Sequence, residues 1–163
     1  IQGSTGPTGP QGTTGATGPT GPQGTISSAY ILLSATGLGF QNHGTLSFNT
    51  TNISKNLSRS GNGVTIPAGQ AGKYLVYGET SFGTNGTSDR AIQLFIYKNG
   101  SNSNVPYSLS SIIYTQTTTY KQITISGIMD LSVGDSITLY TAATTFNVII
   151  HTLNSKLYMV RIE

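Results

Sequence analysis

Glycine recurs at every third position at the start of the chain, from Gly3 to Gly24, without an error of phase. Proline directly follows glycine in half of these triplets, at Pro7, Pro10, Pro19 and Pro22. A strict Gly-X-Y period is the pattern of three polyproline-II chains wound together, because only glycine fits at the crowded axis. A flexible tether is the alternative interpretation, but a tether does not need a fixed phase. The pattern predicts a collagen-like triple-helical stalk over residues 1–26.

The predicted stalk has little that could set its own register. It contains no charged residue, since the first in the chain is Lys55. Proline never occupies the third position of a triplet, where hydroxyproline stands in collagen. A rod this short is therefore expected to be marginal alone. Because a triple helix needs three chains, we expect a homotrimer whose register is held by the rest of the chain, residues 27–163.

Residues 27–163 are expected to form one all-β head domain. Charged residues make up 8% of the chain, which excludes a helical bundle or coiled coil, and the absence of cysteine excludes a disulfide scaffold. Short runs alternate between apolar and polar residues and end at turn signals such as Asn99-Gly100. About ten short strands predict a sandwich of two antiparallel sheets. The expected strands include residues 30–35, 45–48, 64–67, 73–77, 90–98, 115–129, 136–140, 146–150 and 157–162.

Two of these strands, residues 90–98 and 156–162, carry large apolar side chains on both faces. A sandwich strand that faces water should be polar on its outer side, so we expect another subunit to cover one face. The alternate set Tyr158, Val160 and Ile162 is assigned to the space between the sheets. A one-residue register error would exchange the two sets. The trimer interface is then expected to contain Leu157, Met159, Arg161, Phe95 and Tyr97.

Three segments resemble the C1q/TNF-like jelly-roll proteins. Residues 72–77, Gly-Lys-Tyr-Leu-Val-Tyr, resemble the family's glycine-x-tyrosine-x-aromatic strand. Residues 125–137 resemble its hairpin with a Leu-x-x-Gly-Asp turn, and residues 156–162 resemble its buried C-terminal strand. One departure is Val76, where vertebrate members usually have phenylalanine. The resemblance implies a ten-stranded, trimeric jelly roll behind the stalk.

The threonine-rich Gly-Pro-Thr triplets, joined to a low-charge head, resemble the Bacillus collagen-like spore-surface glycoproteins of the BclA type. The resemblance implies a structural filament on the spore surface (the exosporium), outside the cell, with other spore-surface or filament proteins as partners. It also implies O-glycosylation of outward-facing threonines, for which simple solvation is the alternative. These threonines are Thr5, Thr8, Thr14, Thr17 and Thr20.

The residues that carry enzyme chemistry are scarce, so the chain is not expected to be an enzyme or to need a cofactor. Only His43, read as part of a turn, and His151, read at a strand end, could serve as a catalytic histidine, and both are interpreted as ordinary. The five acids are scattered, with Asp130 and Asp135 the one pair that flanks a single turn. We favour a role for Asp135 in bonding the turn backbone over metal binding.

Charge and hydropathy exclude two classes of partner. Lysine and arginine do not cluster, so nucleic-acid binding is not expected. No apolar run approaches the roughly 20 residues of a membrane helix. The head of the expected filament would present an adhesive or protective tip, with loops 84–89 and 99–104 as the candidates for adhesion to a glycan or host-surface ligand. The alternative function, of a different class, is a phage or cell-surface receptor-binding tip that recognises a glycan. Because the chain begins within a repeat, we expect a preceding segment that carries an anchor or targeting motif.

Overall fold

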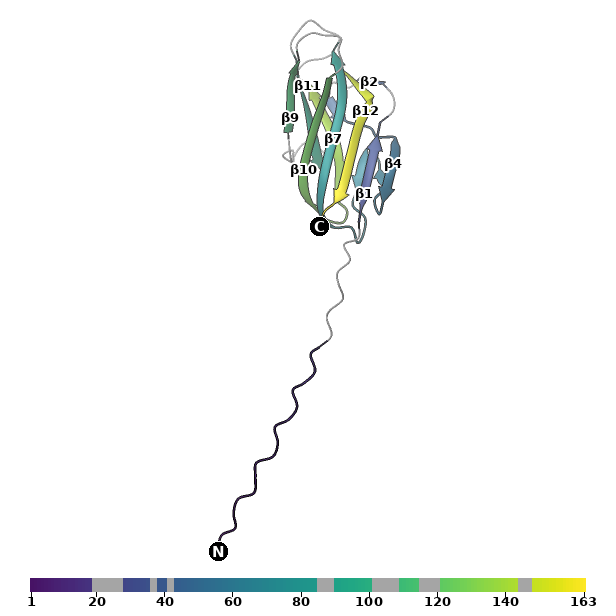
Figure 1. Ribbon diagram of the computed structural model, residues 1–163. Coiled ribbons are helices and arrows are strands. Elements are labelled where there is room, and N and C mark those ends of the chain that lie inside the picture. The colour runs from purple at the N-terminus through teal and green to yellow at the C-terminus, as the bar shows by residue number, and fades with distance from the viewer. Residues whose placement is uncertain are drawn as a thin grey trace.

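Two antiparallel sheets face one another in the computed structural model of the chain (Figure 1). The structure describes residues 1–18, 28–35, 38–40, 43–84, 90–100, 109–114, 121–143 and 148–163. These residues contain twelve strands and no helix, so the described part of the chain offers no helix that could cross a membrane. The prediction of an all-β sandwich is confirmed.

The first sheet has the order β10–β7–β12–β1–β4, with the short β2 paired to β12. β12 is its central strand, and β10 and β4 form its edges. Its strands are β1 (Tyr30–Ser34), β2 (Leu38–Phe40), β4 (Thr50–Lys55), β7 (Gly72–Thr84), β10 (Lys121–Leu131) and β12 (Val148–Arg161).

The second sheet has the order β5–β6–β11–β8–β9, with the short β3 paired to β11. Twelve strands exceed the ten that were expected, because β2, β3 and β5 are only two or three residues long and leave no periodic signal. The strands of this sheet are β3 (His43–Thr45), β5 (Arg59–Ser60), β6 (Gly63–Thr65), β8 (Arg90–Lys98), β9 (Leu109–Tyr114) and β11 (Ser136–Ala143).

The core lies between the two sheets and follows the strand alternation. In β8, Ile92, Leu94 and Ile96 are buried, while the side chains between them point outward, as the sequence predicted. In β10 the buried residues Ile123, Ile125, Met129 and Leu131 likewise alternate with exposed ones. The largest buried side chains are Tyr74, Phe48, Phe82, Ile31, Leu33, Leu46 and Ile66. Burial of this apolar area is the main stabilising contribution to a fold without disulfides.

β12 is one long strand, whereas the sequence predicted two strands at residues 146–150 and 157–162. Its pairing with β7 shifts register between His151 and Lys156. Such a bulge lets one strand continue through a break in the apolar alternation, which is why the local pattern read as two strands.

The turn after β10 joins the two sheets and does not close a hairpin, contrary to the prediction for residues 125–137. β10 lies at an edge of the first sheet and β11 inside the second. Gly134 adopts φ 90°, a conformation that glycine takes without strain. A Leu-x-x-Gly-Asp turn reverses the chain in either case, so its residues alone do not reveal which sheet receives the next strand.

Residues 1–18 are extended and exposed and form no strand or helix (Figure 1). The glycines of this segment have open space around the position of an added Cβ, with nothing within 4 Å at Gly3, Gly6, Gly9, Gly12, Gly15 and Gly18. Within one chain, therefore, no steric contact explains the strict glycine period. The predicted boundary at residues 26 and 27 lies outside the described residues.

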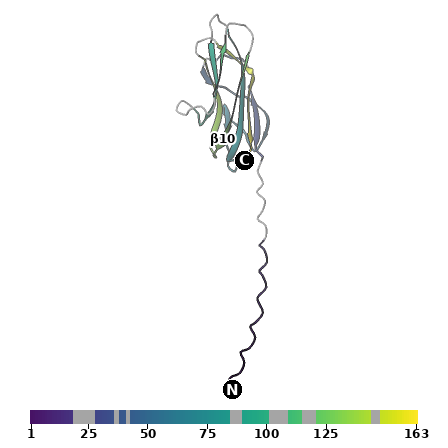
Figure 2. The ribbon, with the colours of Figure 1, turned by 60° about the vertical axis from the view of Figure 1, so that its left-hand side comes forward.

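The head begins and ends at the same end of the sandwich, which we call the base. The backbone N–H of Arg161 donates to the carbonyl of Ala29 over 2.8 Å, so the start of β1 lies beside the end of β12. Figures 1 and 2 both place the C-terminus at this end.

Candidate interaction faces and the basal pocket

The outer face of the first sheet carries a continuous apolar band. Leu32 of β1 lies opposite Tyr158 of β12 and Ile53 of β4. Across the next pairs, Leu75 of β7 lies opposite Val160 and Ile128. Ile53 and Ile128 are more than half exposed, at 52% and 59%. The apolar band therefore crosses five of the six strands of the sheet, all except β2. It consists of Tyr30, Leu32, Ile53, Leu75, Tyr77, Ile128, Tyr158 and Val160.

Charged groups bound the apolar band at one end. Lys156 pairs with Glu79 over 2.6 Å, and the hydroxyl of Tyr77 donates to the other oxygen of this carboxylate over 2.9 Å. Burial, followed by the hydrogen bond to Glu79, raises the pKa of Tyr77 above its usual range. The phenol thus stays protonated near neutral pH and keeps donating. Because Glu79 and Lys156 satisfy one another, they bring no unpaired charge to the apolar band.

Leu157 and Met159 do not lie on this outer face. Both have 0% exposure and belong to the core between the sheets, so the expected assignment of the two faces of β12 was wrong. Tyr158 and Val160, which were assigned to the core, are the residues on the outer face. Ile162 follows the end of β12 and is 41% exposed. Both alternate sets of residues in this strand contain large apolar side chains. Alternation alone therefore cannot show which set faces the core.

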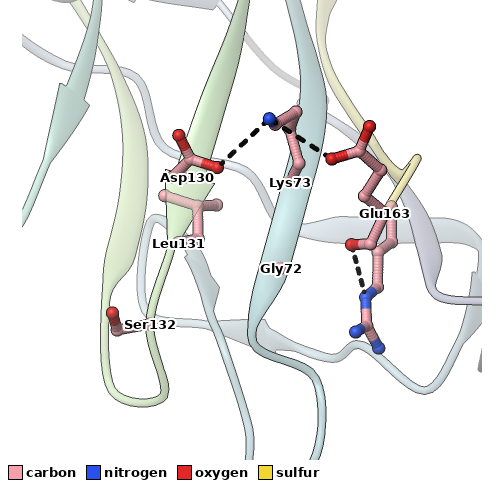
Figure 3. Close-up of a pocket in the computed structure, with 7 residues that line it drawn as sticks. Gly72, Lys73, Asp130, Leu131, Ser132 and Glu163 are labelled. Carbon is pink, nitrogen blue, oxygen red and sulfur yellow. Dashed lines mark hydrogen bonds and ion pairs between the residues drawn. The ribbon is translucent and has the colours of Figure 1, made fainter.

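Arg161 lies at the base and lines a shallow pocket of about 360 Å³ (Figure 3). Its Nε donates to the carbonyl of Glu163 over 2.9 Å. Lys73 lies between two carboxylates, 3.3 Å from Glu163 and 3.8 Å from Asp130, as Figure 3 shows. These carboxylates raise the pKa of Lys73, with the hydrogen bond to Glu163 as the largest cause. Lys73 is paired with two carboxylates and Arg161 is bonded to a backbone carbonyl, so the arrangement resembles a surface polar network more than an anion site.

Phe95 and Tyr97 lie on the outer face of the second sheet, on the opposite side of the sandwich from the apolar band. Tyr140 of β11 lies opposite Phe95, and the three rings contact one another. The ring centroids of Tyr97 and Tyr140 are 4.9 Å apart. The sequence placed Phe95 and Tyr97 in the same interface as the C-terminal strand; the two surfaces instead face opposite ways. Tyr140 was missed because the cluster depends on the pairing of β8 with β11.

Asp135 bonds the backbone of its own turn, as the sequence predicted. Its carboxylate accepts the N–H of Ser132 over 2.7 Å and a hydrogen bond from the amide of Asn99 over 2.8 Å. Lys98 lies 2.8 Å away. Burial alone would raise the pKa of Asp135, but the hydrogen bonds from Lys98, Asn99 and Ser132 outweigh it and hold the pKa below its usual range.

The other candidate residues are spread over the chain. His43 begins β3 and His151 lies within β12, so neither is in the turn or strand end that was expected, and their side chains lie outside the described residues. Among the residues that the structure describes, no three His, Cys, Asp or Glu side chains gather as metal ligands. Thr5, Thr8, Thr14 and Thr17 are exposed, whereas Thr20 and most of loops 84–89 and 99–104 lie outside the described residues.

The two facing sheets and their strand order define a TNF-like jelly roll, and solved structures with this fold match the chain. Crystal structures of murine APRIL, a TNF-family protein, cover 83% of this chain and 99% of their own. The TM-scores are 0.57 at pH 8.0, 0.60 at pH 8.5 and 0.54 at pH 5.0, with sequence identities of 14%, 14% and 15%. No protein-family model matches the chain, and no curated protein matches its sequence. The likeness concerns the fold.

Proposed function

We propose that this chain is a structural filament protein of a bacterial spore surface, in which three jelly-roll heads associate and hold three collagen-like segments in register. The apolar band on the first sheet is the observation that carries the proposal. It crosses five strands, and exposed apolar surface of this extent is typical of a protein interface. The ion pairs lie at its ends and leave its centre uncharged.

The position of β1 relates this interface to the stalk. Tyr30, the first residue of β1, belongs to the apolar band, and Ala29 immediately before it is held at the base by Arg161. Three heads packed through their apolar bands around a common axis would bring three copies of residue 29 together at one end. Three N-terminal segments would then enter their heads side by side, which is the arrangement that a triple helix requires.

The glycine period supports the same conclusion. A Cβ on any of the six described stalk glycines would touch nothing in its own chain. Close approach to two neighbouring chains supplies a steric reason for glycine at every third position. A collagen-like stalk therefore accounts for a feature that the single chain leaves unexplained.

The location and decoration of the filament are proposed from the sequence resemblance. A spore-surface position and other filament proteins as partners follow from the likeness to the BclA-type glycoproteins. O-glycosylation of the stalk threonines belongs to the same proposal, and the exposure of the four described ones gives a transferase access. Mass spectrometry of protein isolated from the spore surface would detect hexose additions on Thr5 to Thr20.

Light scattering on the full chain tests the proposal. Three chains of 17.0 kDa predict a particle of about 51 kDa. Circular dichroism should show a collagen-type signal that melts on heating. Val160→Asp places three carboxylates into the proposed interface, where like charges are costly, so both the trimer and the collagen signal should be lost. Asn62→Asp adds the same charge at an exposed turn and should change neither.

Two results would contradict the proposal. One is a monomeric wild-type chain at micromolar concentration. The other is a Val160→Asp variant that remains trimeric and keeps its thermal stability, because the interface would then have to lie elsewhere.

A further inference from the structure

The aromatic cluster on the second sheet, formed by Phe95, Tyr97 and Tyr140, is not used by the proposed interface. The centroids of Phe95 and Tyr97 are 5.8 Å apart, and those of Phe95 and Tyr140 are 6.2 Å apart. Tyr97 and Tyr140 are inclined by 32° to each other. Each ring is half-buried and packed against the other two, so the rings are held in place while part of each remains open to solvent. A ligand that contacts them would pay little for ordering these side chains.

Three side chains beside the cluster are neutral and of a kind that can form hydrogen bonds. Gln93 lies two residues before Phe95 on the same face of β8. Thr138 lies opposite Tyr97, and Thr45 lies opposite Tyr140. Within the described residues, the outward-pointing positions of β6, β8 and β11 carry no charged side chain. These three strands therefore offer no charge that would attract an acidic or basic partner.

The two tyrosine hydroxyls are free to bind a ligand. Within the described part of the chain, neither the phenol of Tyr97 nor that of Tyr140 takes part in a hydrogen bond. Burial, followed by the proximity of Tyr140, raises the pKa of Tyr97, so its phenol is protonated at neutral pH and can donate. A phenol hydroxyl can also accept a hydrogen bond. The cluster thus offers exposed ring surface together with hydroxyl groups that can donate and accept hydrogen bonds.

The composition of this face differs from that of the apolar band, and the difference indicates a different kind of binding partner for each surface. Five of the eight residues of the apolar band are leucine, isoleucine or valine and three are tyrosines, a composition that suits a dry protein interface. Around the aromatic cluster the neighbouring positions are Thr45, Thr138 and Gln93, with Leu109 of β9 opposite Phe95. Aromatic rings attract weakly polarised C–H groups to their electron-rich faces, and hydroxyl and amide groups bind hydroxyl groups. A pyranose ring carries both C–H groups and hydroxyl groups. A neutral sugar also suits a surface that lacks charged side chains.

We propose that Phe95, Tyr97 and Tyr140 form a binding site for a neutral carbohydrate, with Gln93, Thr138 and Thr45 as polar neighbours. A sugar ring packs its C–H groups against the aromatic rings, and its hydroxyls bond to the two phenols. The site lies on the side of the sandwich opposite the apolar band, so it does not depend on trimer formation. If the heads form the proposed trimer, three such sites point away from the axis and can act together, which raises avidity for a surface that displays many sugars.

Titration of the full chain with neutral tetrasaccharides tests this site. The probes are cellotetraose, mannotetraose and chitotetraose, followed by saturation-transfer NMR and by tyrosine fluorescence. Tyrosine emission is readable because the chain contains nine tyrosines and no tryptophan. We expect at least one probe to bind with a dissociation constant of about 1 mM, typical of a small, open site. The binding should shift the tyrosine emission.

Two variants separate the rings from the hydroxyls. Phe95→Thr with Tyr97→Thr removes two rings but keeps residues that favour strands, and should weaken binding by about tenfold or more. Tyr97→Phe with Tyr140→Phe keeps all three rings, and therefore the fold, and should weaken binding several-fold. Gln122→Ala, at an exposed position of β10 that belongs neither to the cluster nor to the apolar band, should leave binding unchanged.

Four outcomes would overturn the proposal. The first is that no neutral probe binds at about 10 mM. The second is that the ring-deleted and hydroxyl-deleted variants both bind as the wild type does. The third is equal affinity for tetragalacturonate, which is acidic and would contradict selection by the uncharged face. The fourth is a change in molar mass in the hydroxyl-deleted variant, which would make this face a contact between copies of the chain. None of these outcomes bears on the apolar band, which is tested by Val160→Asp.

Discussion

At Gly78 of β7, the side chain of Leu139 reaches across from the opposite sheet and lies close to the backbone. A Cβ at this position would lie 2.6 Å and 2.7 Å from the two methyl carbons of Leu139, on the opposite sheet, and 3.2 Å from Ile125 of the neighbouring strand. Leu139 therefore fills the space that a side chain at position 78 would occupy. The sequence predicted a strand at residues 73–77, directly before Gly78. The reason for glycine at position 78 becomes clear only from its contact with the opposite sheet.

Gly78→Ala should destabilise the head by overpacking. The added methyl group has to displace Leu139 or move the sheets apart, which typically costs about 1–3 kcal/mol. Chemical denaturation of the full chain measures the change in the free energy of unfolding. Gln122→Ala, at an exposed position of β10, should differ from the wild type by less than about 0.5 kcal/mol. A Gly78→Ala variant as stable as the wild type would mean that the core relaxes freely at this point.

Asp135 should make the head sensitive to acid. Its pKa in the folded chain is lowered, so its contribution to stability is complete above the unfolded value of about 3.9 and is lost as the pH falls through the folded value. Asp135→Asn removes the charge that Lys98 pairs with. The variant should melt at a lower temperature than the wild type at pH 6, and its melting temperature should fall less between pH 6 and pH 2.

Thermal denaturation across this pH range checks the prediction. Asp130→Asn is the matched control, because its side chain is 84% exposed and its nearest cation is 3.8 Å away. It should follow the wild type at every pH. Parallel curves for the wild type and Asp135→Asn would show that the turn carboxylate does not contribute to acid sensitivity.

At the scale of single elements, β12 shows where sequence reasoning succeeds and where it stops. Its burial and its antiparallel neighbours agree with a central, two-sided apolar strand. Which side faces the core could not be predicted, because Leu157 and Met159 are as apolar as Tyr158 and Val160. The choice depends on the register with β1 and β7, which is a property of three strands far apart in the sequence.

Met159→Asp and Val160→Asp should therefore act on different levels of the structure. Met159 is fully buried between the sheets, so a carboxylate there should unfold the head itself. Val160 lies on the outer face, so the protomer of the Val160→Asp variant should keep its β-sheet signal in far-ultraviolet circular dichroism. A folded Met159→Asp protein, or an unfolded Val160→Asp protein, would reverse the assignment of the two faces.

β4 marks a second limit of prediction from sequence. β4, with the sequence Thr-Thr-Asn-Ile-Ser-Lys, is exposed over most of its length and shows no apolar alternation. It is a strand because β1 pairs with it across five residues. β8, by contrast, alternates strongly, and its bounds agree with the prediction for residues 90–98. Strands that contribute to the core can be read from sequence, whereas strands that only extend a sheet edge depend on their partner.

At the scale of the whole molecule, substitution of a glycine in the N-terminal repeat can distinguish a flexible tether from a triple-helical stalk. In one chain, an alanine at Gly9 would meet nothing within 4 Å, so a tether would accept it. In a triple helix of three identical chains the same methyl group enters the crowded axis three times, once from each chain. The approximate start of the β-sandwich could be read from the sequence, because the glycine period stops at Gly24 and strand alternation begins soon after it.

Gly9→Ala should weaken the collagen signal of the full chain and lower its melting temperature by several degrees or more, while the melting of the head stays unchanged. Thr8→Ala changes the neighbouring residue, which a triple helix presents to solvent, and should have a much smaller effect. Circular dichroism at the collagen maximum and in the β-sheet region follows both transitions in one sample. An equal response to Gly9→Ala and Thr8→Ala would favour the tether.

The entry of the chain at the base, through a strand flanked on both sides, also determines how the head responds to force. β1 pairs with β12 on one side and with β4 on the other, and its first residue lies at the base. If the far end of the head is held while the N-terminal segment is pulled, the load runs along β1, perpendicular to its interstrand hydrogen bonds. Both ladders must then shear at once instead of opening one bond at a time. The head is therefore built to resist traction along its long axis.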